Sequence, residues 1–373
     1  MKIFAVEDTT AQVVWRRLPG AGVVRAADAA VAVSGAGGPG AVVLEGLPAD
    51  TVLDLVFVPT GGQARRVGRF RTLRPPPGPE LARVATVNDC HLGGKGFGLL
   101  PRAHHPGGPF PVDTHERCLR AAVAEAVAWG AGLLVVKGDL TDTGQEAQWR
   151  SAARVLGGAG VPVAVVPGNH DVMVGSSAGQ ALLAEAGVHL TVGDAEAYDV
   201  PGLRVIAADS SQPPHHHGSM EARSAHVLDL AADAPGAVMV ALHHQLERHE
   251  LRTTWPPGIP RCEAVPFLDA LAEVNPAALV TAGHTHRHRR RHHGPVVLTE
   301  LGSSKDFPGT WAGYAVHEGG IRQVVRRVAD PAVLGWTDAT RHCYLGLWGP
   351  WSSWTLGARC FSHAWPAGTR PGR

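Results

Sequence analysis

The 373-residue chain lacks several features that assign proteins to broad classes. Its 34 lysine and arginine residues nearly balance 33 aspartate and glutamate residues, so no overall charge favours binding to nucleic acid or to a membrane surface. No apolar run approaches the roughly 20 residues that a membrane-spanning helix needs. The charged start, Met1–Asp8, comes before any apolar run of signal length. We therefore expect a soluble, cytoplasmic protein with no membrane partner.

Cysteine and lysine are also scarce. The five cysteines include no close CxxC pair, and an odd number is a poor basis for a disulfide framework. Lysine occurs only four times, so arginine clusters reflect a compositional habit and carry little weight. Histidine, by contrast, occurs 21 times. It is the commonest metal ligand in proteins, so its positions along the chain are the first place to look for a site.

The chain divides into segments of different character. Residues 1–74 alternate short β-branched runs with turn residues, which predicts a small all-β sandwich. The run from Leu44 to Leu53, followed by Phe70–Leu73, resembles a fibronectin type III domain, although Leu53 stands where that family has its corner tyrosine. Prolines make residues 75–80 a stiff linker. The tryptophan-rich tail, 329–373, should pack on the rest of the chain because free it would aggregate. Cys343 and Cys360 are candidates for close approach within it.

Residues 81–328 have the pattern of an α/β domain, in which buried strands alternate with helices. We expect strands at 81–87, 132–136, 161–166, 237–242 and 277–281, and helices near 115–129, 144–157, 220–233 and 263–273. Each strand runs into a polar cluster: Asp89-Cys90-His91, Gly138–Asp142, Gly168-Asn169-His170-Asp171, His243-His244 and Gly283-His284-Thr285-His286. Sites in open α/β sheets lie at these strand ends. Carboxylate, amide and imidazole groups together suit Mn, Fe or Zn.

In their order the five clusters resemble the calcineurin-like metallophosphoesterase superfamily, whose pattern is DxH, GDxxD, GNHD or GNHE, a lone His, and GHxH. The resemblance implies a four-layer αββα catalytic domain with a dinuclear centre. It implies a first metal held by Asp89, His91 and His286, a second held by Asn169, His243 and His284, and Asp139 bridging the two. The family's ligand is the first histidine of such a pair, hence His243 and not His244. Two ions about 3.5–4 Å apart would turn a bridging water into a hydroxide nucleophile and neutralise charge on the phosphate.

The remaining residues of the clusters have expected roles in catalysis. His170 is placed to protonate the leaving alkoxide or to stabilise the transition state, and Asp171 to orient it. His244 and Asn169 are candidates for contact with the substrate. Asp142 is either a partner of a ligand or a loop cap.

Departures from the family pattern narrow the substrate class. Purple acid phosphatases also pair an N-terminal β domain with this catalytic layer, but they carry a tyrosine ligand where Asp142 stands. The string Gly138–Gly144, with Trp149 further on, most resembles class III cyclic nucleotide phosphodiesterases and glycerophosphodiesterases. Small phosphodiesters or phosphomonoesters are the expected substrates. A nuclease acting on DNA or RNA, and a non-catalytic binding protein that uses its β domain, remain as alternatives.

Three further histidine-bearing stretches lie near these clusters in sequence. The loop 92–111, with His104 and His105, has the length of a lid or specificity element. His215–His217 is another candidate border of the site, although a solvated loop or adventitious metal binding is at least equally favoured for both stretches. The segment Arg287–His293 could contact a substrate phosphate or RNA. The favoured interpretation is that it forms the solvent-exposed face of a strand.

Overall fold

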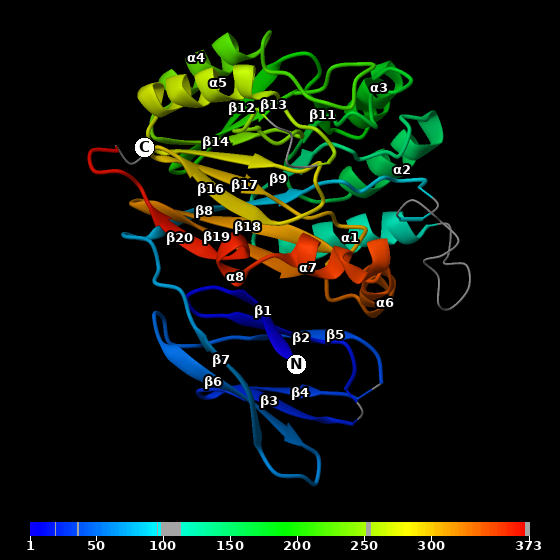
Figure 1. Cartoon of the computed structure of the whole chain (residues 1–373), viewed down its shortest axis with the longest axis vertical. Helices are drawn as coiled ribbons and strands as arrows, with labels where there is room; N and C mark the ends of the chain where they lie inside the picture. Colours follow the sequence, from blue (N-terminus) through cyan, green and yellow to red (C-terminus); the bar gives the residue numbers. More distant parts are fainter. Residues whose placement is uncertain (19, 36, 95, 98–112, 251–254, 370–373) are drawn as a thin grey trace.

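The computed structural model describes residues 1–369 apart from 19, 36, 95, 98–112 and 251–254. The N-terminal part forms two antiparallel sheets (Figure 1). One contains β1 (Lys2–Val6), β2 (Ala11–Trp15) and β5 (Gly40–Leu44); the other contains β3 (Gly22–Ala26), β4 (Ala29–Val33), β6 (Val52–Pro59) and β7 (Arg65–Arg71). Along β6, Leu53, Leu55 and Phe57 are buried and alternate with more exposed residues, as expected of a strand with one face on a core. The predicted all-β region is confirmed.

Two larger sheets follow. The first runs in the order β11-β10-β9-β8-β18-β19-β20 and the second in the order β12-β13-β14-β15-β17-β16. The first consists of β8 (Glu80–Val87), β9 (Leu133–Lys137), β10 (Val163–Val166), β11 (His189–Leu190), β18 (Thr310–His317), β19 (Gly320–Arg327) and β20 (Phe361–Ala364). The second consists of β12 (Ala195–Val200), β13 (Leu203–Ala208), β14 (Ala237–Ala241), β15 (Ala278–Ala282), β16 (Arg289–His293) and β17 (Val296–Glu300). All five expected strands are present, but they are shared between two sheets.

The two sheets pack face to face with helices outside them (Figure 1). Val84 and Val135 of the first sheet share a core with Met239 and Leu279 of the second. The helices α1 (Thr114–Ala128), α2 (Glu146–Leu156) and α3 (Ser177–Glu185) accompany the first sheet, and α4 (Ser224–Ala232) and α5 (Arg261–Val274) cover the second. Because both faces of each sheet are covered, β9 and β14 are buried along their whole length and are apolar except for Lys137. The αββα prediction is confirmed.

The C-terminal residues extend the first sheet and lie against it. After α6 (Pro331–Thr340) come the short helices η1 (Tyr344–Gly346), α7 (Trp348–Ser353) and α8 (Leu356–Arg359). β20 then pairs with β19. Asp330 begins α6 by accepting bonds from the backbone N–H groups of Ala332 and Val333. Cys343 and Cys360 form no disulfide, since all five cysteines are free. Among the described residues, no helix combines the length and apolarity that crossing a membrane requires.

A buried charge cluster joins the N-terminal β region to the first large sheet. Glu7 is 3% exposed and accepts bonds from Arg326, from Arg322 at 3.3 Å and from the Trp129 indole at 3.3 Å. Burial raises the pKa of Glu7, but Arg326 and Arg322 outweigh it and hold the pKa below its usual value of 4.5. The ion pair therefore stabilises the folded chain fully at pH values above 4.5, the usual pKa of a glutamate. This stabilisation is lost as the pH falls through the lowered pKa of Glu7.

The Glu7→Gln variant should lower the free energy of unfolding by about 3 kcal/mol, because the largely buried Arg326 loses its carboxylate partner, whereas Arg322 keeps Asp8 at 2.7 Å and Glu80 at 3.5 Å. Denaturant unfolding at pH 7 measures this loss, and the variant's stability should fall less steeply than the wild type's when the pH is lowered from 5 to 3. Glu45→Gln, at an exposed position of the same region, is the control. Equal stability of the two variants would contradict the role of the cluster.

Candidate metal centre

The loops that follow β8, β9, β14 and β15 meet where the ends of the two large sheets come together. Five of the predicted ligands have positive φ angles: Asp89, His91, Asp139, His284 and His286. This conformation is unfavourable for residues other than glycine, and such strain is typical of functional sites. Here it turns the side chains off the strand ends toward a shared centre.

Asp89, His91 and His286 form the first group. Nε2 of His286 lies 3.4 Å from Oδ1 of Asp89 and 3.3 Å from Nε2 of His91. The potential ligand atoms of all three lie within 4.8 Å of one another. The two residues of β8's loop are thus joined to a residue about 200 positions later in the chain.

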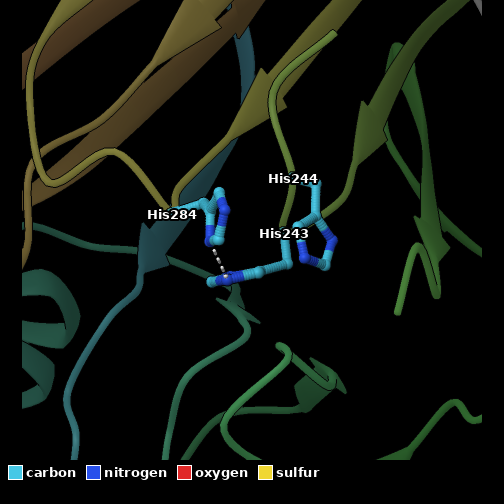
Figure 2. A group of neighbouring side chains, drawn as sticks. All are labelled: His243, His244 and His284. Carbon is cyan, nitrogen blue, oxygen red and sulfur yellow. Dashed lines mark hydrogen bonds between the residues drawn. The ribbon is translucent and has the colours of Figure 1, made fainter. Parts of the chain in front are cut away.

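His243 and His284 form a second group beside the first. Nε2 of His243 lies 3.0 Å from Nδ1 of His284, as the dashed line in Figure 2 shows. The same nitrogen is 3.4 Å from Oδ2 of Asp139, and that oxygen is also 3.5 Å from Nε2 of His91. One carboxylate oxygen therefore faces both groups, which is the position that a bridging ligand requires.

Backbone hydrogen bonds determine which ring nitrogens carry protons. Nδ1 of His243 lies 2.9 Å from the carbonyl oxygen of Lys137, and Nε2 of His284 lies 3.1 Å from that of Pro257. A carbonyl oxygen only accepts, so these nitrogens donate, and the two nitrogens that face each other bear lone pairs in the neutral rings. Two lone pairs 3.0 Å apart repel, so either a proton held by one ring or a metal ion must lie between or beside them. The donor set therefore fits a metal ion.

Asp306 imposes the same arrangement on the first group. Its Oδ2 lies 2.6 Å from Nδ1 of His286, so Nδ1 donates and the Nε2 lone pair is directed at Asp89 and His91. Carboxylates commonly orient metal-binding histidines in this way. Sequence reasoning missed Asp306, because it lies in the loop between β17 and β18 and belongs to none of the five clusters.

The charges of the centre also favour a cation. Burial lowers the pKa of His243, but the carboxylates of Asp139 and Asp89 outweigh burial and raise it to about 9. Burial, together with the charge of His243, lowers the pKa of His284 well below its usual value. The carboxylates thus hold one positive charge among these rings, and the same attraction acts on a divalent ion.

Asn169 lines the same cavity as His91, His284 and His286. Its Oδ1 is buried and has no hydrogen-bond partner among the described residues, while its Nδ2 lies 3.2 Å from Nδ1 of His216. An unsatisfied buried amide oxygen costs about 1–3 kcal/mol, and a metal ion bound to it would remove that cost. His216, from the stretch His215–His217, also lines the cavity described below.

The structure corrects the expected link between Asp171 and His170. The carboxylate of Asp171 accepts bonds from the backbone N–H groups of Leu140, Thr141 and Gly168, so it holds two of the ligand loops together. His170 is instead oriented by the carbonyl oxygen of Asp142, 2.7 Å from its Nδ1. Burial, with the charge of Asp139, raises the pKa of Asp171 to about 6.

A cavity of about 1160 Å³ opens above the centre. Its polar side is lined by His91, Asp139, Asn169, His170, His284 and His286. His244, expected to contact the substrate, is fully buried and is not among the lining residues. Its ring packs against those of His243 and His284 (Figure 2). Asp142 lies 3.4 Å from Nδ1 of His91, the position of a partner to a ligand.

The sequence of this region matches a known family. The sequence profile described as calcineurin-like phosphoesterase matches residues 82–288, more than half of the chain. The chain belongs to the calcineurin-like phosphoesterase family. The five polar clusters at the strand ends lie within the matched residues, whereas Asp306 and β16 lie beyond them.

Individual members of the family share parts of this sequence. A probable cyclic nucleotide phosphodiesterase of Rhodococcus erythropolis is 36% identical over 145 residues, covering 36% of this chain and 45% of that protein. A cAMP/cGMP dual specificity phosphodiesterase of Mycobacterium tuberculosis is 34% identical over 117 residues, covering 30% and 36%. The matches thus span less than half the length of either relative.

Two solved structures resemble the chain at low sequence identity. A dimetal phosphatase from Danio rerio has a TM-score of 0.44 at 13% identity, covering 68% of this chain and 98% of that one. A purple acid phosphatase from yellow lupin has a TM-score of 0.46 at 12% identity, covering 88% and 72%. Such likenesses do not bear on activity.

The arginine-rich segment is not the solvated face expected from sequence. Arg287 is 1% exposed, donates to Glu300 at 2.8 Å and lies 4.8 Å from the ring centre of Trp351. Only some of the segment, including Arg290, is exposed. Pairing with a tryptophan some 60 residues later was not visible in the local sequence. His104 and His105 lie outside the described residues.

Gly168 is a sensitive test of the geometry. A Cβ at this position would lie 2.2 Å from Oδ1 of Asp139. The Gly168→Ala variant should therefore displace that carboxylate, lower the metal content of the purified protein and reduce kcat/KM by about a hundredfold.

Gly335→Ala is the matched control, because no atom lies within 4 Å of its added Cβ. Elemental analysis of both variants measures the bound metal directly. Full metal content in Gly168→Ala would contradict this prediction. It would show either that Asp139 is not a ligand or that the loops carrying Gly168 and Asp139 move to make room for the Cβ without loss of metal binding.

Proposed function

We propose that this chain is a metal-dependent phosphoester hydrolase with a dinuclear centre. Asp89, His91 and His286 would hold one ion, and Asn169, His243 and His284 the other, with Asp139 shared. The observation that carries this proposal is the arrangement of the ligand atoms: the ring nitrogens that no backbone carbonyl engages face each other and one shared carboxylate oxygen. Family membership points to the same reaction.

The chain's own residues have separable tasks in this reaction. Two bound ions would supply an acidified water and would neutralise charge on the phosphate oxygens. Asp306 and the carbonyl groups of Lys137 and Pro257 hold the ligand rings in one tautomer. Asp171 fixes the loops that carry Asp139 and Asn169.

His170 is the proposed proton donor. It lines the cavity, and because Nδ1 donates to the carbonyl of Asp142, Nε2 is the nitrogen free to exchange a proton with a substrate. Its backbone N–H donates to Oδ1 of Asp139 at 2.9 Å, which fixes its distance from the centre. From this position it can protonate a departing alkoxide oxygen.

Small phosphodiesters, or phosphomonoesters, are the proposed substrates. The two relatives described as phosphodiesterases support this choice for the part of the sequence that they share.

A nuclease is less favoured, since Arg287 and Arg289 stack on tryptophan rings. The non-catalytic alternative is disfavoured because no ligand position is lost. The fibronectin type III likeness, the domain limits and the cytoplasmic location stay predictions.

Metal removal is the direct test of the proposed reaction. Protein stripped with a chelator should lose hydrolysis of bis(4-nitrophenyl) phosphate and recover it with Mn, Fe or Zn. Asp139→Ala should show no recovery and lowered metal content, because the shared ligand is gone, whereas Asp194→Ala, at an exposed position, should behave as wild type. Metal-independent turnover, or full activity in Asp139→Ala, would rule the centre out.

A second test addresses His170 alone. His170→Ala should keep its metal yet lose about 10²–10⁴-fold in kcat on an alkyl phosphate ester, because proton transfer contributes that much. Loss on a nitrophenyl ester should be much smaller, since nitrophenolate leaves without protonation. Equal losses on both esters would instead favour transition-state stabilisation, and no loss on either would remove His170 from the mechanism.

A further inference from the structure

One side of the cavity above the metal centre is built by the C-terminal segment. The side chains of Phe97, Trp255, Tyr344, Leu347, Trp348 and Trp351 line it, and we call this set the apolar wall. Four of the six come from Tyr344–Trp351, beyond the residues that match the family profile. The wall is therefore a feature of this chain in addition to the shared catalytic core.

The wall is fixed to the centre through Asp306. Nε1 of Trp348 donates to Oδ1 of Asp306 at 3.2 Å, and the other oxygen of the same carboxylate orients His286. The ring of Phe97 lies near both Trp348 and His286: its centre is 4.9 Å from that of Trp348 and 6.1 Å from that of His286. A molecule whose phosphate lies at the centre would therefore contact the wall with its next atoms.

Several side chains of this region are exposed although they are apolar. Leu347 is 69% exposed and Trp255 81% exposed, and the neighbouring Leu345 is fully exposed. Contiguous exposed apolar surface in a soluble domain marks a binding site. Tyr344 and Leu345 also have positive φ angles, a strained conformation that persists where the surrounding structure imposes it.

The chemistry of the cavity is divided between its two sides. Carboxylate, amide and imidazole groups lie at the metal centre, whereas the wall presents mainly carbon. The indole N–H of Trp348 is occupied by Asp306, and the ring of Trp351 is packed against the guanidinium of Arg287. A nucleobase needs hydrogen-bond partners for its edges as well as a stacking surface, whereas a hydrocarbon chain needs only the apolar surface.

We propose that the substrate is an amphiphilic phosphoester, with its phosphate at the metal centre and a hydrocarbon chain along the apolar wall. This rests on the proposed function and specifies its substrate class. The cavity of about 1160 Å³ is larger than ordinary small-molecule sites, which measure about 300–1,000 Å³. Such a space accommodates a chain in addition to the phosphate.

A chain-length series tests the proposal with the metal-loaded, full-length protein. The substrates are 4-nitrophenyl alkyl phosphates with methyl, butyl and octyl groups, each assayed below its micelle concentration. Because each buried methylene strengthens binding about threefold to fourfold, kcat/KM should rise at least a hundredfold from methyl to octyl, mainly through KM. Thymidine 5′-(4-nitrophenyl) phosphate serves as the nucleotide comparison.

Variants locate the effect on the wall. Leu347→Ser and Trp255→Ser come from separate segments and alter strongly exposed side chains, so folding should be preserved. Each should lower the octyl-to-methyl ratio of kcat/KM at least fivefold. Val274→Ser, an exposed apolar position outside the cavity, should keep the wild-type ratio.

The possible outcomes distinguish the amphiphilic substrate from the underlying proposal that the chain is a phosphoester hydrolase. If the methyl ester is hydrolysed and kcat/KM does not depend on chain length, the proposal of an amphiphilic substrate is wrong, while the proposed hydrolase function stands. A nucleotide ester preferred over the octyl ester would likewise overturn it, in favour of a base-binding wall. Failure to hydrolyse any of these esters with any metal would remove the proposed function itself.

Discussion

The structure depends on one electrostatic constraint, the convergence of acceptor atoms on a small volume. His243 and His284 present ring nitrogens whose protons are committed elsewhere, and Asp139 places a carboxylate oxygen beside them. Acceptors alone repel at such distances, so the arrangement requires positive charge between them. The raised pKa of His243 is the response of the protein's own groups to this requirement. A cation meets it in full.

Holding acceptors in this arrangement requires rigid supports and strained turns. Ten non-glycine residues of the described chain have positive φ, and eight of them lie at the metal centre or in the segment Tyr344–Trp354. Each such conformation costs about 1–3 kcal/mol and persists only when packing enforces it. The stable cores between and outside the two sheets provide that enforcement. Small residues are needed as well, since a Cβ at Gly138 would lie 2.5 Å from the ring of His243.

Sequence patterns could predict what depends on local order. Apolar strands followed by polar clusters indicated the strand ends, and the family resemblance indicated the αββα layers. What they could not reveal depends on contacts between distant segments. Asp306 has no motif of its own, and its role is visible only once β17 and β18 place it beside His286. The short α3 was also missed, because Gly179 and Leu183 are its only buried residues and give no helical stripe. The stacking of Arg287 on Trp351 is likewise a long-range contact.

The tail shows why composition alone was a poor guide to function. Its tryptophans predicted packing, yet their burial differs: Trp336 is 3% exposed and donates to the carbonyl of Lys305, whereas Trp354 is 48% exposed. The buried tryptophan anchors the segment, so the exposed apolar side chains that follow are held in place at the cavity. Burial of Trp336 is explained by the hydrophobic effect, but exposure of Leu347 and Trp255 opposes it. A ligand with a hydrocarbon surface would remove that cost, so the wall bears on the part of the substrate beyond the phosphate, which the metal ligands do not contact.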